Sequence, residues 1–282
     1  MDEQSSSKIN QLEKDLPEGL LVDAAWLEKK GYYGSQRKQY VDRGWLEQPA
    51  HRVYRRTRGQ LRWEQVVISL QTLLEQPVVV GGRTALELQG FAHYLPQEQK
   101  EIHLYGQKPL PTWLPTLPLP QKFIFHRTGH LFRNDPITRG LGSIAWNLQT
   151  GIGVSTDQIH GQFNVMPWGQ WDWPLTVSVA ERAMLEMLDE LPEKESFHQA
   201  DMLMEGLATL SPRRLEKLLV DCKSVKVKRL FFFFADRHQH RWLAHLDRSK
   251  IDLGSGKRML VRGGKLDATY QITVPEEFHA VQ

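Results

Sequence analysis

The chain has a single cysteine, Cys222, among its 282 residues. This excludes an intrachain disulfide framework and a thiol-rich zinc site. The sequence also lacks an apolar run near the ~18 residues that a membrane span needs, and its first ten residues, MDEQSSSKIN, hold no apolar core of a secretion signal. We therefore expect a cytoplasmic protein with no membrane partner.

The composition is that of a folded protein. Hydrophobic residues make up 40% of the sequence, and nine tryptophans and eleven phenylalanines are available for packed cores. A chain of 282 residues is long enough for two domains.

Positive charge is concentrated in two regions. Residues 34–62 hold eight lysines or arginines against two acids, and residues 212–250 hold eleven against four. Since the whole chain carries +3, everything outside these regions carries −10. Two basic regions on an otherwise acidic chain indicate contact with a polyanion such as nucleic acid. The alternative is that these charges cluster by chance on solvent-exposed helix faces and contact no polyanion.

The N-terminal residues have the pattern of three short helices and a two-stranded hairpin. Ser7 is a suitable cap for the first helix, segment 21–33 has the spacing of the second, and Ser35 and Gly44 bracket the third. Residues 45–59 then alternate about a Pro-Ala turn and are rich in arginine.

This order is the layout of a winged helix-turn-helix, in which the third helix enters the major groove and the hairpin contacts phosphates. Arg37 lies one turn before the apolar Val41, so the sequence leaves open whether its side chain points toward solvent or toward the protein interior. The expected DNA contacts are Ser35, Gln36, Arg37, Lys38, Gln39 and Arg43 on the third helix, and His51, Arg52, Arg55 and Arg56 on the hairpin. A winged helix that contacts only protein is the alternative.

The segment PVVVGGRTALELQGFAHYLP, residues 77–96, has the strand, glycine turn and helix with which nucleotidyltransferase sites begin. Those enzymes need an Asp-x-Asp pair on the next strand to hold Mg²⁺. Here that strand reads Glu101-Ile102-His103, and imidazole is a poor ligand for Mg²⁺. We expect no catalytic residue, metal or other cofactor, and glycines that serve a tight turn. An active nucleotidyltransferase is kept as an alternative.

Further strands and several isolated polar residues complete the middle of the chain. A small sheet is expected from residues 78–80, 101–105, 122–128 and 136–142, and the Trp-rich WGQWDWP (168–174) is interpreted as a packing element. Asp157 and Asp172 are isolated and do not supply the missing carboxylate pair. The spacings of His93, His103, His126 and His130 fit no zinc template, and these residues are interpreted as structural.

The remainder is expected to be helical. Ser178 and Glu181 have the spacing of a capping box, and Ser211 and Pro212 begin a later helix. Val225 and Val227 alternate with Lys226 and Lys228 as in a strand, but the run Phe231–Phe234 and Ala235 favours a buried helix that ends near Arg237. A final hairpin is expected to turn at Gly263-Gly264 between residues 259–261 and 268–274. A cationic rim is predicted from Arg213, Arg214, Lys217, Lys223, Lys226, Lys228 and Arg229, with an ordinary solvated rim as the alternative.

Four stretches, in order along the chain, resemble the AbiEi antitoxins. The first three stretches are GSQRKQYVDRGWLEQPAHRVYRR, PVVVGGRTALELQGFAHYLP and ERAMLEMLDELP, and the fourth begins with LEKLLVDCKSVKVKRLFFFFADRHQHRW. The resemblance implies a bacterial regulator of a type IV toxin–antitoxin system in abortive infection. Its winged helix would bind inverted repeats in the promoter of its own operon, and its C-terminal domain would protect against a nucleotidyltransferase toxin without forming a stable complex with it.

By position, the resemblance places the DNA-reading helix at Ser35–Arg43, the wing at Leu46–Arg56 and the antitoxic surface on the cationic rim. Arg37 departs from the apolar residues that relatives often carry in this helix.

The expected fold class is α+β, with an N-terminal winged helix-turn-helix followed by a mixed α/β domain that has a small sheet and a helical C-terminal part. We expect a DNA-binding domain at 1–60, a linking helix at 61–76 and an antitoxin domain at 77–282, divided into 77–175 and 176–282. A non-enzymatic autorepressor and antitoxin is the leading hypothesis. An RNA-binding domain that shields the toxin's substrate is a further alternative.

Overall fold

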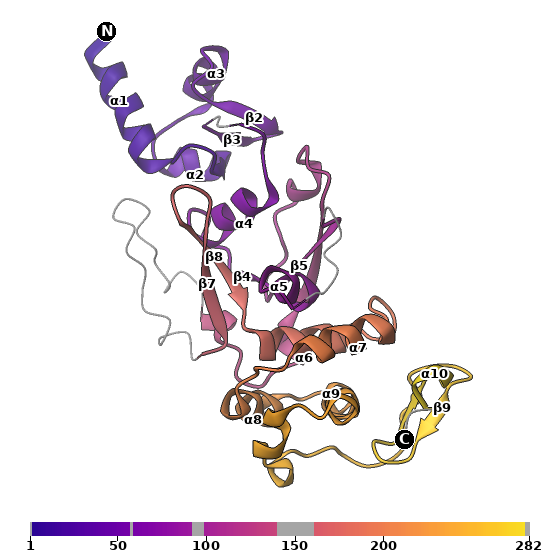
Figure 1. Ribbon diagram of the computed structural model, residues 1–282. Helices are drawn as coiled ribbons and strands as arrows, with labels where there is room; N and C mark the ends of the chain where they lie inside the picture. Colours follow the sequence, from indigo (N-terminus) through magenta and orange to yellow (C-terminus); the bar gives the residue numbers. More distant parts are fainter. Residues whose placement is uncertain (1, 57–58, 92–98, 140–160, 280–282) are drawn as a thin grey trace.

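The computed structural model describes residues 2–56, 59–91, 99–139 and 161–279. Figure 1 shows a small N-terminal unit at one end, a five-stranded sheet in the middle, and helices with a short hairpin at the other end. The α+β fold class is confirmed. His93, Asp157 and Arg58 lie outside the described residues.

The N-terminal unit combines three helices with a three-stranded antiparallel sheet in the order β1-β3-β2. Its elements are α1 (Asp2–Asp15), β1 (Leu21–Asp23), α2 (Ala24–Lys29), α3 (Gly34–Asp42), β2 (Glu47–Ala50) and β3 (Val53–Arg55). Asp23 caps α2 by accepting a hydrogen bond from the Trp26 backbone amide at 2.8 Å. This is the helix-helix-helix-wing order that the sequence predicts, with one additional strand.

Three expected boundaries in this unit were wrong. Ser7 lies inside α1, which begins at Asp2, and Ser35 lies in the first turn of α3, whose cap is Tyr33. Val22 belongs to β1 instead of a helix, because its backbone pairs with Tyr54 of β3 and its side chain is fully buried.

Helix α4 (Trp63–Gln71) joins the N-terminal unit to the rest, and all nine of its residues are buried. On one side the Ser69 hydroxyl accepts a hydrogen bond from the Leu21 amide of β1 at 3.0 Å. On the other side the Gln71 amide group exchanges two hydrogen bonds with the Thr176 backbone, each of 2.9 Å. The linking helix is therefore packed between both halves of the chain.

The middle sheet has the strand order β6-β5-β4-β8-β7. Its strands are β4 (Val78–Val80), β5 (Glu101–Gly106), β6 (Lys122–Arg127), β7 (Phe163–Trp168) and β8 (Trp173–Ser178). The β5–β6 and β4–β8 pairs are parallel, whereas β4–β5 and β7–β8 are antiparallel. Helix α5 (Gly82–Leu88) follows β4, and short 3₁₀ turns lie at η1 (Leu114–Thr116) and η2 (Thr128–His130).

One sequence expectation for this sheet needs correction. Residues 136–139 form a 3₁₀ turn, η3 (Pro136–Arg139), instead of a strand, and residues 140–142 lie outside the described residues. The Trp-rich segment lies at the tip of the β7–β8 hairpin, where Trp168 pairs with Trp173 and both pack in or against the hydrophobic core, so its interpretation as a packing element is confirmed.

The C-terminal part is mainly helical. Its elements are α6 (Ala180–Asp189), α7 (Phe197–Gly206), α8 (Pro212–Asp221), α9 (Val225–His238), η6 (Arg241–His245), η7 (Arg248–Lys250), β9 (Lys265–Asp267), β10 (Ile272–Val274) and α10 (Glu276–His279). Ser211 caps α8 and Pro212 is its first residue, as predicted. The buried α9 with its four phenylalanines is also confirmed.

The capping box and the last hairpin were predicted wrongly. Ser178 ends β8, and its hydroxyl donates to the Glu186 carboxylate at 3.1 Å, so it does not cap α6. The Glu181 carboxylate accepts from the Ser211 amide at 2.7 Å, which ties α6 to the start of α8. β9 and β10 pair with each other and are joined by residues 268–271, so Gly263-Gly264 precedes the hairpin.

One hydrophobic core runs through the molecule, from Leu12 in α1 to Phe278 in α10. Residues of α4 and of β4, β5 and β8 contribute to it along with those of the terminal elements. A continuous core of this kind predicts that both halves unfold together.

Candidate nucleic-acid interface

Helix α3 projects from the end of the molecule that lies away from the five-stranded sheet (Figure 1). Ser35, Lys38 and Gln39 are exposed on it, and Gln36 is half-buried and donates a hydrogen bond to the Tyr40 hydroxyl at 2.9 Å. Tyr40 anchors the inner face between Tyr32 and Trp45. The helix therefore presents a polar side on a rigid aromatic base.

Arg37 does not belong to that polar side. It is 8% exposed, its Nη2 lies 2.9 Å from Glu28, and its Nη1 donates to the Tyr32 carbonyl at 2.9 Å. The side chain points toward α2, where Nη1 also donates to the Ala24 carbonyl at 3.4 Å. The expected DNA contact by Arg37 is thus wrong, because the residue fastens α3 to α2.

Two wing arginines also face inward. The side chain of Arg55 is 4% exposed, and it donates to Glu47 and to the Gly59 carbonyl, each at 2.8 Å. Arg56 contacts the Leu16 carbonyl at 3.3 Å and pairs with glutamates of the α1 region. The phosphate contact expected of Arg55 is therefore wrong, because β3 is the central strand of its sheet, whereas the contact expected of Arg56, whose side chain is 18% exposed, stays a prediction.

The other wing residues are accessible. His51 and Arg52 form the exposed turn between β2 and β3, and Arg52 has a left-handed backbone with φ of 60°. Arg43, at the end of α3, lies over the Trp45 ring at 5.3 Å. Of the described cations expected to contact DNA, Lys38, Arg43 and Arg52 are thus exposed, with His51 beside them.

Because Arg55 is buried and paired, its replacement is expected to act on folding. Arg55→Ala removes the hydrogen bonds that this side chain donates to Glu47 and to the Gly59 carbonyl, which is expected to lower the free energy of unfolding by about 1–3 kcal/mol. Chemical denaturation followed by tryptophan fluorescence measures this loss. The exposed Arg52→Ala is the matched control, with a change of about 0.5 kcal/mol or less. Equal stability of the two variants would contradict the internal role of Arg55.

The predicted C-terminal cationic rim is divided in the same way. Arg213, Lys217 and Lys223 are exposed. Arg214 pairs with Glu181 at 2.9 Å, and Lys226 donates to the Leu191 carbonyl at 2.9 Å.

Lys228 and Arg229 are buried, at 4% and 3% exposure, so their expected place on the surface was wrong. Arg229 donates to the carbonyls of Leu253 and Gly256, at 2.7 Å each, and so holds the chain that leads from α9 to β9. Helix α9 is buried on several sides, which leaves these two cations no outward face.

The glycine turn after β4 is filled by the protein itself. The Gly82 amide, at the start of α5, donates to the Glu186 carboxylate at 3.0 Å. A Cβ atom on Gly81 would lie 2.3 Å from the same carboxylate and 2.5 Å from the Tyr105 ring, and Gly82 has φ of +52°. The place where a transferase would hold a phosphate is occupied by Glu186, and the glycines admit this carboxylate and Tyr105.

A buried ion network supports this turn. The Arg182 side chain is fully buried and lies 2.7 Å from Glu186 and 3.2 Å from Asp135. Its guanidinium also lies over the rings of Phe132 and Phe163, at 4.4 and 4.8 Å. Burial raises the pKa of Glu186, while Arg182 opposes that rise. The sequence carries a signal for this pair, since Arg182 and Glu186 are four residues apart on α6.

His103 and His126 form a hydrogen-bonded chain beside the network. Arg83 approaches His103 Nε2 at 3.5 Å, His103 Nδ1 lies 3.0 Å from His126 Nε2, and His126 Nδ1 lies 2.8 Å from Glu190. Burial, with help from His126 and Arg83, lowers the pKa of His103 to about 3, so this imidazole stays neutral. The structural interpretation of both histidines is confirmed, and the exposed His130 pairs with Asp189.

Glu195 provides a pH-dependent test of this cluster. Burial, opposed by Arg83 and reinforced by nearby glutamates, raises its pKa from 4.5 to about 7. The folded protein therefore keeps a proton that the unfolded chain has lost, so this group reduces stability as pH rises from about 4.5 to 7.

Glu195→Gln is expected to gain Tm relative to the wild type on going from pH 5 to pH 8, measured by thermal unfolding. The lowered pKa of His103 contributes with the opposite sign in both proteins. The exposed neighbour Glu193→Gln should show a Tm difference that is independent of pH. The same flat difference for Glu195→Gln would contradict the raised pKa.

Within the described ranges, His, Cys, Asp and Glu side chains form no group of three that could hold a metal ion. Among the described helices, none has both the length and the apolar character needed to cross a membrane.

Two protein-family models together match most of the chain. Residues 5–97 match the family model described as the N-terminal domain of the AbiEi antitoxin transcriptional regulator, and residues 99–275 match the one described as the AbiEi antitoxin transcriptional regulator of the type IV toxin–antitoxin system. No curated protein matches.

The crystal structure of the RV2827C protein from Mycobacterium tuberculosis is similar, with a TM-score of 0.53 and 16% identity over 95% of this chain and 90% of that chain. At this identity the likeness supports the fold alone. The two family matches decide the relationship, and the chain belongs to the AbiEi antitoxins, the transcriptional regulators of type IV toxin–antitoxin systems.

Proposed function

We propose that this protein is a DNA-binding autorepressor and antitoxin that represses its own operon and protects the cell from a nucleotidyltransferase-type toxin without a stable toxin complex. The DNA-binding unit is residues 1–60, the linking helix lies in 61–76, and the antitoxin part is 77–282, with a sheet region at 77–175 and a helical region at 176–282. Acting on its own operon places it in the bacterial cytoplasm.

The exposed polar side of α3 carries the DNA-binding proposal. It offers amide, hydroxyl and ammonium groups at a projecting end, which is what base readout in the major groove requires. The proposed contacts are Ser35, Gln36, Lys38, Gln39, Arg43, His51 and Arg52. Because Arg55 pairs with Glu47 and Arg56 pairs with Glu13, we expect each copy of the chain to make few phosphate contacts.

A gel-shift titration tests the proposal, with the promoter region of the protein's own operon and a scrambled duplex of equal length as the two probes. We expect tighter binding to the promoter, with inverted repeats protected in footprinting. Specific DNA binding typically exceeds non-specific binding about 10³-fold or more, so equal affinity for both probes would refute the repressor.

The antitoxic effect is assigned to the exposed cations Arg213, Lys217 and Lys223. Replacing all three with alanine should abolish rescue of cells that express the toxin, while promoter binding stays unchanged. Lys108, Lys122 and Arg127 are exposed and outside this surface, so their triple alanine variant is the control. Unimpaired rescue by the 213/217/223 variant would remove the assignment.

RNA binding by the same cations is the second candidate, because α8 presents Arg213 and Lys217 together on its exposed side. Filter binding of the full chain to tRNA and to duplex DNA distinguishes the two. Loss of tRNA binding alone in the triple variant would favour this candidate.

We propose no enzymatic activity, since Glu186 fills the glycine turn and His103 is bonded to His126. Transfer from labelled nucleoside triphosphates to tRNA, abolished by Glu101→Ala, would instead establish the nucleotidyltransferase alternative.

A further inference from the structure

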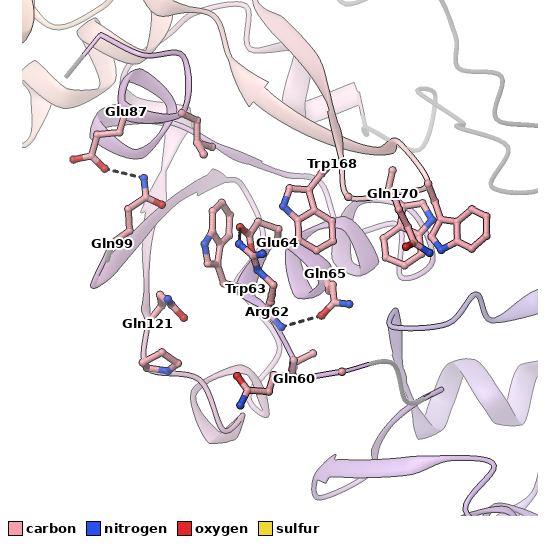
Figure 2. Close-up of a pocket in the computed structure, with 17 residues that line it drawn as sticks. Gln60, Arg62, Trp63, Glu64, Gln65, Glu87, Gln99, Gln121, Trp168 and Gln170 are labelled. Carbon is pink, nitrogen blue, oxygen red and sulfur yellow. Dashed lines mark hydrogen bonds and ion pairs between the residues drawn. The ribbon is translucent and has the colours of Figure 1, made fainter. Parts of the chain in front are cut away.

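A pocket of about 1050 Å³ lies where the chain leaves the wing and meets the tip of the β7–β8 hairpin. Figure 2 shows residues of both segments, together with Gln99 and Gln121 near the beginnings of β5 and β6, around one hollow. Four tryptophans and five glutamines contribute to its lining, whose charged members are Arg62, Glu64 and Glu87. This volume gives room for a ligand of about nucleoside size, with planar apolar faces and amide groups to contact it.

Arg62 occupies part of this pocket in a manner that resembles a bound ligand. Its guanidinium lies over the Trp168 ring at 5.3 Å, and its Nη2 donates to Glu64 Oε1 at 3.0 Å. The Arg62 side chain is 63% exposed, whereas that of Glu64 is 8% exposed. In Figure 2 the labelled Arg62, Glu64 and Trp168 lie close together. The guanidinium can therefore move into solvent without disturbing the core beneath it.

Glu64 retains unused binding capacity. Its Oε2 is buried and has no hydrogen-bond partner among the described residues, although an unsatisfied buried carboxylate oxygen is costly. Glu87 differs, because it accepts from Gln99 at 3.0 Å and lies 3.7 Å from Arg83. A ligand with two adjacent N–H donors can bond both oxygens of Glu64, which Arg62 does not do.

The charges of the lining residues argue against a ligand that carries a phosphate group. Among the described residues that line the pocket, one arginine, no lysine and two glutamates give no cluster of cations for a phosphate group. The indole faces favour a flat ring that stacks, as aromatic side chains do with nucleobases. Taken together, these features favour a planar nitrogen compound that carries no phosphate.

We propose that this pocket binds a small planar ligand with a guanidine-type edge, which displaces Arg62, stacks on Trp168 and donates two hydrogen bonds to Glu64. Guanine nucleosides and guanidinium metabolites share this edge. The guanine nucleoside fits better, because the pocket with its four indoles is larger than a guanidinium group requires. This proposal does not depend on DNA binding.

Calorimetric titration of the full chain with guanosine, agmatine and adenosine tests the proposal. Guanosine is expected to bind, and adenosine, which lacks the guanidine-type edge, is expected to bind at least tenfold more weakly. Equal binding of the two nucleosides, or no binding of guanosine and agmatine at millimolar concentration, overturns it. Binding of agmatine without binding of guanosine overturns the nucleoside assignment and supports recognition of a guanidine-type edge.

Two variants separate recognition from a structural role. Glu64→Gln should weaken guanosine binding at least tenfold, while Glu75→Gln, in an exposed turn outside the pocket, should not change it. Arg62→Ala should strengthen binding severalfold, because the internal competitor is gone, and the exposed Arg213→Ala is its control. Unchanged or weaker binding by Arg62→Ala overturns the displacement, even if Glu64→Gln fails to fold.

Discussion

Replacing Arg182 with methionine is expected to lower the free energy of unfolding by about 3–5 kcal/mol. The new side chain fills much of the same volume between Phe132 and Phe163, so a cavity is not the main cause. The cause is that Glu186 and Asp135, both buried, lose the cation that lies 2.7 and 3.2 Å from them. Breaking a buried ion pair by removing one partner leaves an uncompensated charge in a medium of low polarity.

The loss should increase with pH. Arg182 holds down the pKa of Glu186, so without it that pKa rises further above its ordinary value of 4.5. A group with a raised acid pKa in the folded state costs more stability as pH increases through that range. Urea denaturation at pH 5.5 and pH 8 measures both the size and the direction of the effect.

Adding Glu186→Gln to Arg182→Met provides the test of cause. The double variant should recover part of the lost stability, because the neutral amide can still accept the Gly82 hydrogen bond without carrying a charge. Arg213→Met, on the exposed side of α8, should change stability by about 0.5 kcal/mol or less. A loss below 1 kcal/mol for Arg182→Met would show that the network contributes little.

Replacing Lys38 and Gln39 with alanine is expected to reduce the preference for the promoter over a scrambled duplex, by about 1–3 kcal/mol for each lost base contact. Both side chains are exposed on α3 and neither supports its packing, so the fold should be unaffected. Competition gel shifts with the two duplexes measure the preference directly. Lys108→Ala, an exposed lysine outside the N-terminal unit, is the control.

Removing His51 and Arg52 together should have a different effect. These residues form the exposed wing turn, and contacts to phosphates carry no sequence information, so affinity for both duplexes should fall alike and the salt dependence should become shallower. If the Lys38 and Gln39 variant also loses affinity equally for both duplexes, α3 does not read bases.

The sequence predicts the elements of the N-terminal unit but not which of its arginines face outward. The alternation of the hairpin predicts Arg55 on its outer side, and residues 21–23 are expected to be helical. Once β1 pairs with β3, Arg55 lies in a central strand opposite Leu21 and Glu47. Arg37 is similar, since its burial depends on the Tyr32 carbonyl and Glu28 of a neighbouring helix. Local periodicity does not carry this information.

The glycine turn shows the same limit over a longer distance. Sequence comparison with a transferase pattern correctly indicated that a carboxylate pair was missing on β5. It gave no sign that Glu186, 104 residues beyond Gly82, would bond the amide at the helix start. The sequence also does not predict the pairing of β7 with β8, because all six residues of β8 are buried and the strand has no alternation of apolar and polar residues.

The position of α4 couples the two proposed activities, repression and protection. Its residues are buried from both sides, by β1 in the N-terminal unit and by β8 in the sheet, so removal of either half would expose buried residues of α4. When intracellular proteases clear this protein, promoter occupancy and protection should decline with one shared half-life. Renewed transcription of the operon would then begin at the moment the cell becomes vulnerable.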